Sequence, residues 1–112
     1  MTARLTADFW VRAYLARLEK AGIPAFVTAR GDATAGAVLV KIASLDGQAT
    51  AYQRSFDIAS DNRVWVILQA GDERSVDAAV ARQRGFDPDL WVIEVEDRKG
   101  RSLLEEPGLA TD

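Results

Sequence analysis

Hydrophobic residues recur three and four positions apart over residues 7–21 of the 112-residue chain. Val11, Leu15 and Leu18 form this apolar stripe, and the charged side chains of the segment fall on the other sides of a helical wheel. Thr6 stands where a residue can cap the first turn, and a glycine and a proline follow the segment. The pattern predicts an amphipathic helix.

Short β-prone runs follow this helix. Residues 25–30 and 37–45 are separated by GDATAG, whose glycines and aspartate are typical of a turn. The next run, residues 48–56, follows Asp46 and Gly47, a pair that favours a two-residue hairpin turn because both residues tolerate positive φ. The pattern predicts three strands here.

A two-residue turn also sets the register of the hairpin that it closes. It places Ile42 opposite Ala51 and Lys41 opposite Tyr52. Residues that alternate along a strand share a face of the sheet. The predicted core face carries Val38, Val40, Ile42, Ala51 and Gln53, and the opposite face carries Leu39, Lys41, Tyr52 and Arg54.

The rest of the chain alternates between strand and helix. A nearly continuous apolar run over residues 63–69, RVWVILQ, indicates a fourth strand in a central position that is buried on both sides. Residues 72–84 carry a thin apolar stripe around Val76 and Ala79, which predicts a second helix. A fifth strand is predicted over residues 90–96.

The elements thus follow the order α-β-β-β-β-α-β, which predicts an α+β domain. Short connections between consecutive strands favour an antiparallel meander, so we expect a mostly antiparallel five-stranded sheet. Its apolar face needs a cover, and we expect both helices to pack on this one face in a two-layer architecture. The predicted domain spans residues 1–106, and residues 107–112 have the composition of a frayed tail. The partners of the fifth strand are left open.

Composition narrows the possible classes of function. The chain has no cysteine and no histidine, which excludes disulfides, zinc–thiolate sites and Ser-His or Cys-His catalysis. It carries a net charge of −3 without a basic stripe, so nucleic acid is a poor partner. No apolar run reaches the roughly 18 residues of a membrane span, and the start of the chain does not resemble a signal peptide. We therefore expect a single-domain cytoplasmic protein without a cofactor.

The stretch FDPDLWVIEVEDRKG, residues 86–100, contains Pro-Asp and Asp-Arg-Lys, the ingredients of a magnesium-dependent nuclease site. In such a site two carboxylates converge on one cation, with oxygens at about 2.1 Å from it. Here Asp89 and Asp97 stand at the two ends of one predicted strand, roughly 26 Å apart. The match to the nuclease pattern is therefore accidental.

One pair of carboxylates in this strand remains a candidate metal site. Glu94 and Glu96 share a face and lie about 7 Å apart at their Cα atoms, close enough to share a cation. A third carboxylate, Asp87 or Asp89, could complete the site. The plainer interpretation places both glutamates at a solvent-facing end of the strand and both aspartates in a turn around Pro88.

Aromatic side chains give a candidate interaction surface. Tyr14, one helical turn after Trp10, and Tyr52 could belong to an exposed patch that binds a partner protein. Packing of the aromatic residues in the core is the alternative. Arg30 and the backbone amides of GDATAG could also bind a small anion, although GDATAG lacks the spacing of a phosphate-binding loop.

Two blocks of sequence, RGDATAGAVLVK and FDPDLWVIEVED, make the chain resemble a family of short bacterial proteins. This family is mainly alphaproteobacterial and is catalogued as domain of unknown function 1491. The resemblance implies a cytoplasmic single-domain bacterial protein. It brings no activity, cofactor or site residue with it.

These observations favour a small non-enzymatic binding or accessory module. Its partner would be another protein or a second copy of the chain. The preference depends on absences, since the chain lacks histidine, cysteine, a phosphate-binding loop and a basic patch. The alternative is a divalent-metal-dependent hydrolase of a phosphate ester that uses Glu94 and Glu96.

Overall fold

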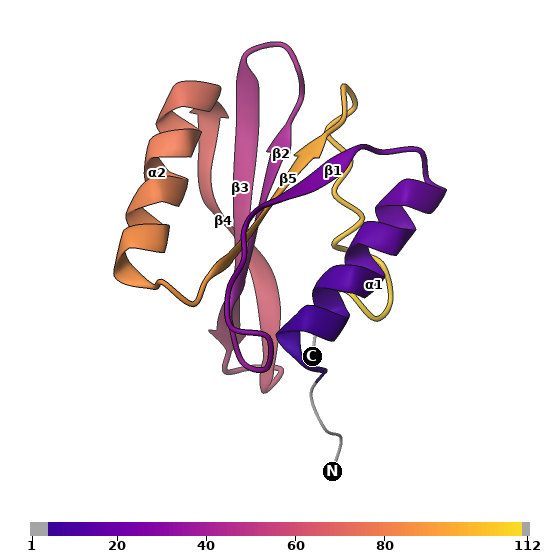
Figure 1. The fold of residues 1–112 in the computed structure, drawn as a ribbon, viewed down its shortest axis with the longest axis vertical. Coiled ribbons are helices and arrows are strands. Elements are labelled where there is room, and N and C mark those ends of the chain that lie inside the picture. The colour runs from indigo at the N-terminus through magenta and orange to yellow at the C-terminus, as the bar shows by residue number, and fades with distance from the viewer. Residues whose placement is uncertain (1–4, 111–112) are drawn as a thin grey trace.

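The computed structural model describes residues 5–110 as two helices and five strands (Figure 1). In chain order they are α1 (Ala7–Lys20), β1 (Ala25–Ala29), β2 (Val38–Ala43), β3 (Gln48–Asp57), β4 (Asn62–Asp72), α2 (Glu73–Phe86) and β5 (Trp91–Glu96). Thr6 caps α1 by accepting a 3.3 Å hydrogen bond from the N–H of Phe9, and Asp72 caps α2 through the N–H of Ser75 at 3.0 Å. Within the described residues, neither helix is long and apolar enough to span a bilayer. The α+β class and the order of elements are confirmed.

The five strands form one open sheet in the order β1-β5-β2-β3-β4. β2 and β5 run parallel, and the three other pairs are antiparallel, which confirms a mostly antiparallel sheet. The meander is limited to β2, β3 and β4. The last strand of the chain, β5, lies between β1 and β2, so these two consecutive strands are not neighbours.

The linker GDATAG passes close to the start of β5 instead of turning β1 back onto β2. The N–H of Asp32 donates a 3.0 Å hydrogen bond to the carbonyl oxygen of Asp89, and Nε1 of Trp91 donates to the carbonyl oxygen of Asp32 at 2.8 Å. A Cβ atom on Gly31 or Gly36 would collide with the carbonyl oxygen of Asp89. This close approach requires glycine at both positions and carries the chain past β5.

The two helices lie on opposite faces of the sheet (Figure 1), so the expected two-layer arrangement with both helices on one face is wrong. The reason is that β2 and β5 carry apolar residues on both of their faces, so both faces of these strands need a cover. The face under α1, the α1 face, includes Trp10, Val11, Tyr14, Leu18, Val40, Ile42, Trp91, Ile93 and Val95. The face under α2, the α2 face, buries a smaller cluster of Leu39, Ala49, Ala51, Val76, Leu90 and Val92.

The β2–β3 hairpin is one residue out of the predicted register. Ile42 lies opposite Thr50, and Lys41 lies opposite Ala51. Ala51 therefore belongs to the α2 face, and Tyr52 packs against the α1 face. This reverses the predicted assignment of β3 residues to the two faces.

The register differs because the hairpin loop has three residues instead of two. Ser44 and Gln48 close the loop with a 3.1 Å hydrogen bond from the N–H of Ser44. Gly47 adopts φ 89°, and Leu45 adopts φ 63°, a left-handed conformation that is unusual for a residue with a side chain. The Asp-Gly pair thus marks the turn correctly but does not determine its length.

The predicted central position of the fourth strand is wrong, because β4 is an edge of the sheet. Its apolar residues are only partly covered, and Val66 and Ile67 are exposed. β3 pairs with β2 no further than Gln53, whereas its pairing with β4 continues through Asp57. The end of the β3–β4 hairpin therefore extends beyond β2 as a two-stranded ribbon.

The segment after β5 is folded onto the α1 face. Leu109 is buried there, and its carbonyl oxygen accepts a 2.7 Å hydrogen bond from Nε1 of Trp65. The frayed tail predicted at residues 107–112 is thus wrong for residues 107–110, because an apolar anchor holds them. Residues 111–112 and the first four residues of the predicted domain lie outside the described part of the chain.

Candidate functional site

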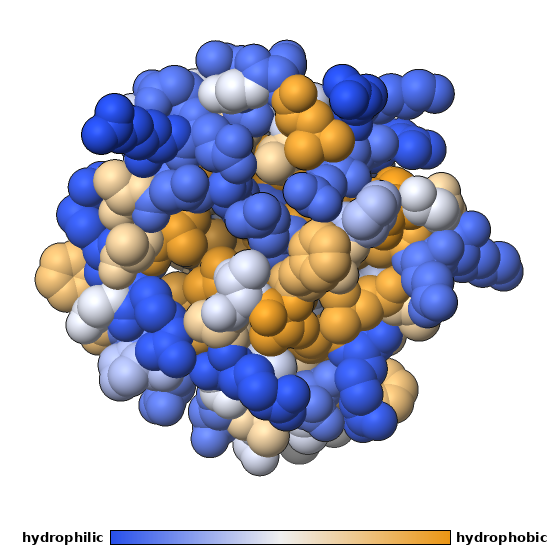
Figure 2. Space-filling model, turned by 45° about the horizontal axis from the view of Figure 1, so that its top comes forward, coloured by the Kyte–Doolittle hydropathy of each residue, from blue (hydrophilic) through white to orange (hydrophobic). Residues whose placement is uncertain are grey.

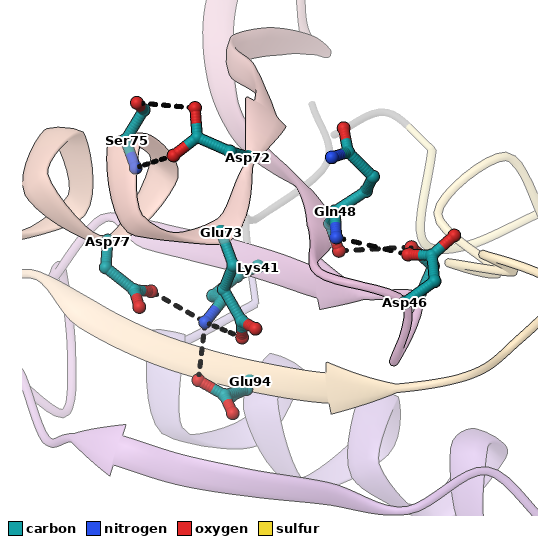
Figure 3. A network of polar contacts seen from close by, with 9 residues as sticks. Lys41, Asp46, Gln48, Asp72, Glu73, Ser75, Asp77 and Glu94 are labelled. Carbon is teal, nitrogen blue, oxygen red and sulfur yellow. Dashed lines mark hydrogen bonds and ion pairs between the residues drawn. The ribbon is translucent and has the colours of Figure 1, made fainter.

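Four charged side chains meet between β2, β5 and α2 (Figure 3). Lys41 is only 4 % exposed. Its Nζ lies 2.7 Å from Oε2 of Glu73, 2.6 Å from Oδ1 of Asp77 and 3.2 Å from Oε1 of Glu94. These four residues form the Lys41 cluster, in which carboxylates from α2 and β5 surround one ammonium group.

The backbone brings the Lys41 cluster together from three elements. Lys41 and Glu94 lie opposite each other in the parallel pair of β2 and β5. Glu73 and Asp77 stand four residues apart at the start of α2, so they share a face of the helix. The N–H of Glu73 also donates a 2.9 Å hydrogen bond to the carbonyl oxygen of Gly47, which ties the start of α2 to the β2–β3 loop.

The charge of Lys41 is stabilised by its surroundings. Burial alone would lower the pKa of Lys41, but hydrogen bonds to Asp77, Glu73 and Glu94 outweigh it and raise the pKa above its ordinary value of 10.5. A lysine that stays protonated at neutral pH is neither a nucleophile nor a general base. The cluster therefore does not provide the chemistry of a Schiff-base lysine.

The two glutamates of the predicted metal pair differ in their surroundings, and a metal role for Glu94 and Glu96 stays a prediction. Glu94 is bound to Lys41, whose ammonium group already supplies a positive charge to its carboxylate. Glu96 is not part of the Lys41 cluster. Among residues 5–110, no three acidic side chains are arranged to hold a metal ion.

Asp87 and Asp89 form the turn around Pro88, in agreement with the plainer interpretation of these residues. Oδ1 of Asp87 accepts a 3.0 Å hydrogen bond from the N–H of Asp89, and the carbonyl oxygen of Asp87 accepts one of 3.1 Å from the N–H of Leu90. Both contacts are local and start β5. They assign the carboxylate of Asp87 to the turn, and a role of Asp87 or Asp89 as a third metal ligand stays a prediction.

The amides of GDATAG are used within the loop itself. The N–H groups of Thr34 and Ala35 donate to Oδ2 of Asp32 at 3.2 and 2.8 Å, and the N–H of Gly36 donates to the carbonyl oxygen of Asp32 at 3.1 Å. Three of the amides considered for a small-anion site with Arg30 thus already have partners within the loop.

Asp97 and Arg101 form an ion pair that the sequence pattern did not reveal. Nε and a terminal nitrogen of Arg101 lie 2.9 and 3.1 Å from the two carboxylate oxygens of Asp97, and the N–H of Arg101 donates at 2.7 Å. These hydrogen bonds lower the pKa of Asp97 to about 2. The acidic-basic stretch that resembled a nuclease site is thus the exit turn of β5, and the spacing of four between Asp and Arg is the only sequence signal for this pair.

The exposed interaction role predicted for Tyr14 is wrong. Tyr14 is fully buried, its hydroxyl donates a 2.8 Å hydrogen bond to the carbonyl oxygen of Ser102, and its ring stacks on Trp10 with centroids 5.0 Å apart. Burial, together with the nearby charge of Glu105, raises the pKa of Tyr14. Tyr14 joins α1 to the C-terminal segment.

Tyr52 is half-buried and lies between two hollows of the α1 face. A hollow of about 310 Å³ extends from Tyr52 toward Gly100, and one of about 380 Å³ extends toward Leu104 and is also lined by Trp65. The side chain thus remains accessible from two sides. An interaction role for Tyr52 stays a prediction.

Arg54 ties the β3–β4 hairpin to α1. Its guanidinium group lies 4.9 Å from the ring centroid of Trp10 and 4.7 Å from that of Trp65. A cation held between two aromatic faces is attracted by both rings. This contact holds the hairpin against α1 at the position of Arg54.

The β3–β4 hairpin carries four of the nine large apolar side chains that are exposed in the described residues. Their exposed fractions are 54 % for Phe56, 87 % for Ile58, 36 % for Val66 and 59 % for Ile67. Single exposed apolar residues are common on protein surfaces, so the feature of interest is that four of them lie on one hairpin.

Apolar surface also occurs away from the hairpin. Figure 2 shows a face on which hydrophobic residues gather near the centre, bordered by hydrophilic ones. Leu15, Ile23 and Phe26 line a hollow of about 430 Å³ between the end of α1 and β1. This hollow is separate in sequence from the hairpin.

These observations define the class of the protein. It is a small α+β domain with a five-stranded sheet, one helix on each face and a buried lysine among carboxylates. The chain belongs to the family described as "Protein of unknown function (DUF1491)", whose model matches residues 5–105. The resemblance carried by RGDATAGAVLVK and FDPDLWVIEVED is thereby confirmed. Both blocks meet where the glycines of the linker pack against Asp89.

Solved structures of alphaproteobacterial proteins resemble the chain over most of its length. A crystal structure of a DUF1491 family protein from Caulobacter crescentus is 40% identical, with a TM-score of 0.79, and covers 92% of this chain and 95% of its own. An NMR structure from the same organism is 39% identical, with a TM-score of 0.81 and coverage of 95% and 97%. A solution structure from A. tumefaciens is 31% identical, with a TM-score of 0.71 and coverage of 84% and 86%. No curated protein matches the chain significantly.

Proposed function

We propose that the protein is a small, cytoplasmic, non-enzymatic binding module that acts through protein–protein contacts. The observation that supports this proposal is the set of exposed apolar side chains on the β3–β4 hairpin, above all Phe56 and Ile58 at its end. The ribbon extends beyond β2, so a partner can reach it without displacing part of the fold.

The apolar end of the hairpin can supply a large share of a binding free energy. Complete burial of one such side chain is worth about 1.5–3 kcal/mol. Phe56 and Ile58 together reach the size of a typical hot spot, around which polar contacts add specificity. Tyr52 lies on the same hairpin and can extend this surface toward the sheet.

A pull-down tests the proposal: the purified chain is the bait, and a lysate of a bacterium that carries the protein supplies the partners. Phe56→Ser and Ile58→Ser are expected to lose the partner that the wild-type chain retains. Phe86→Ser is the matched control, because Phe86 is also exposed, at 82 %, but lies at the end of α2. Equal binding by all three variants, or no specific partner for the wild type, contradicts the proposal.

The alternative is a divalent-metal-dependent hydrolase that uses Glu94 and Glu96, and it has less support. A metal ion would have to displace or share the contact of Lys41 with Glu94. Thermal unfolding in Mg²⁺ or Mn²⁺ separates the two ideas. A stabilisation that disappears in Glu94→Gln would favour the hydrolase, and we expect no such shift.

A further inference from the structure

β4 is an edge strand of unusual length and composition for an unprotected edge. It spans Asn62–Asp72 and pairs, within the described residues, with β3 alone. The outer side of such a strand presents backbone N–H and C=O groups that can pair with another strand. Proteins normally protect these groups with charges, prolines, bulges or a covering segment.

The sequence of β4 offers little of this protection. Residues 64–71, VWVILQAG, contain no charge and no proline, and Arg63 and Asp72 carry the nearest charges. A bulge interrupts β4 at Leu68, where Ala51 and Tyr52 of β3 face residues that are two apart. The bulge leaves the regular stretch before Leu68 available for pairing.

The opposite edge of the sheet is protected better. β1 has only five residues, Ala25–Ala29, and its pairing with β5 is interrupted by a bulge at Thr28. Pro24, which lacks an N–H, comes directly before it. The two edges therefore differ in length and protection, and β4 is the edge that needs a cover.

We propose that the outer edge of β4 pairs in antiparallel fashion with β4 of a second copy of this chain, which joins two five-stranded sheets into one. The inference rests on the proposed role of the β3–β4 hairpin as a protein-binding surface and concerns the β4 edge of this hairpin, which is separate from Phe56 and Ile58 at its end. It places Val66 at the two-fold axis, opposite Val66 of the partner.

Self-complementarity of the strand supports a second copy as the occupant. In an antiparallel pair about Val66, Trp65 lies opposite Ile67 of the partner, within the regular stretch before the bulge. Apolar residues meet apolar residues, and no like charges face each other. The pairing also covers Val66 and Ile67, which are exposed in the single chain.

The chain contains no cysteine, so one introduced cysteine reports on this geometry without interference. Residues directly opposite in an antiparallel pair have Cα atoms about 4.5–5.5 Å apart, within the range of a disulfide. We expect Val66→Cys to oxidise to a covalent dimer about a hundredfold faster than the controls, because pairing makes the reaction effectively intramolecular. The controls are Phe26→Cys on β1 and Ile58→Cys at the hairpin end, whose positions are both more exposed than Val66.

Light scattering of the wild-type chain after size exclusion gives the second measurement. We expect twice the mass of the chain at micromolar concentration, and a monomer for Ile67→Lys, since lysine on an edge strand opposes pairing. Circular dichroism checks that Ile67→Lys remains folded, which its exposed position favours. Val66→Lys is the second variant if Ile67→Lys does not fold.

Two outcomes overturn the inference. The first is a wild-type monomer at every concentration, with Val66→Cys oxidising no faster than Phe26→Cys. If that monomer still binds another protein through Phe56 and Ile58, the proposed function stands and only the second copy fails. The second is a dimer that cross-links through Phe26→Cys, which would assign the interface to β1.

Discussion

The two faces of the sheet are built from the same strands but are stabilised in different ways. The α1 face buries a large cluster rich in aromatic side chains, including Trp10, Tyr14 and Trp91. The α2 face buries a smaller aliphatic cluster and places Lys41 and three carboxylates beside it. The comparison shows that α1 is held by extensive aromatic packing, whereas α2 combines a small apolar contact with ion pairs to Lys41.

The largest expected effect comes from the α1 face. Leu18→Ala should lower the free energy of unfolding by about 3 kcal/mol, because the lost methyl groups leave a cavity in a fully buried site. Leu5→Ala, at an exposed position, should change it little. Urea denaturation followed by circular dichroism measures both, and a loss below about 1 kcal/mol for Leu18→Ala would show that α1 adjusts around the cavity.

The Lys41 cluster gives the next effect. Lys41→Met should lower the free energy of unfolding by about 2 kcal/mol at neutral pH, because three carboxylates then face one another without a cation. Lowering the pH protonates the carboxylates, so the deficit should shrink in acid. Lys20→Met, at an exposed position, is the control. A variant as stable as the wild type at neutral pH would mean that the cluster contributes no net stability.

The same variant tests the sign of the pKa shift of Lys41. A folded-state pKa above 10.5 gives stability that is present below pH 10.5 and is lost as the pH rises through the raised value. The wild type should therefore lose its advantage over Lys41→Met only in strong alkali. Denaturation at a series of alkaline pH values measures the difference, and a loss well below pH 10 contradicts the shift.

A smaller effect is expected at Asp97, directly after the end of β5. Asp97→Asn should lower the free energy of unfolding by about 1 kcal/mol, since Arg101 is solvent-accessible and screened. The pKa of Asp97 is lowered from 3.8 to about 2, so this stability is present above pH 3.8 and is lost as the pH falls toward 2. Acid titration of both proteins should show curves that converge at low pH. Curves that stay parallel would mean that Asp97 acts through packing.

The smallest effect is expected in the β2–β3 loop, whose length sets the register of β3 and so determines which of its residues face α1 and which face α2. Leu45→Gly should raise the free energy of unfolding by about 0.5 kcal/mol, because glycine adopts φ 63° without steric cost. Leu45→Ala keeps a Cβ atom and should bring no gain. Thermal unfolding distinguishes them, and equal behaviour of the two variants would show that Leu45 is not strained.

Local patterns in the sequence predict the elements but not how they are assembled. The helix stripes and strand runs act within a few residues, so α1, α2 and β5 come out within a few residues of their observed bounds. The position of β5 between β1 and β2 depends on contacts between GDATAG and Asp89, which are far apart in the sequence. Periodicity alone contains no information about such contacts.

The faces and the candidate site were missed for related reasons. Alternation assigns a single core face to VLVKIA, although VLVKIA and WVIEVE both carry apolar residues on their two faces and need a cover on each side. The single lysine of β2, Lys41, and a glutamate of β5, Glu94, are in hindsight the sequence signal for the ion cluster. They can be matched only when the parallel pairing of Lys41 with Glu94 is known.

The central position of β5 also affects how the chain becomes folded during its synthesis. β1 and β2 leave the ribosome early, but the strand that joins them is translated last. Until residue 96 is available, the nascent chain holds two apolar strand edges apart with nothing between them. The sheet can therefore be completed only after translation of the domain is nearly complete. A chain that stops before Trp91 exposes apolar strand edges, cannot form the core and is prone to aggregate.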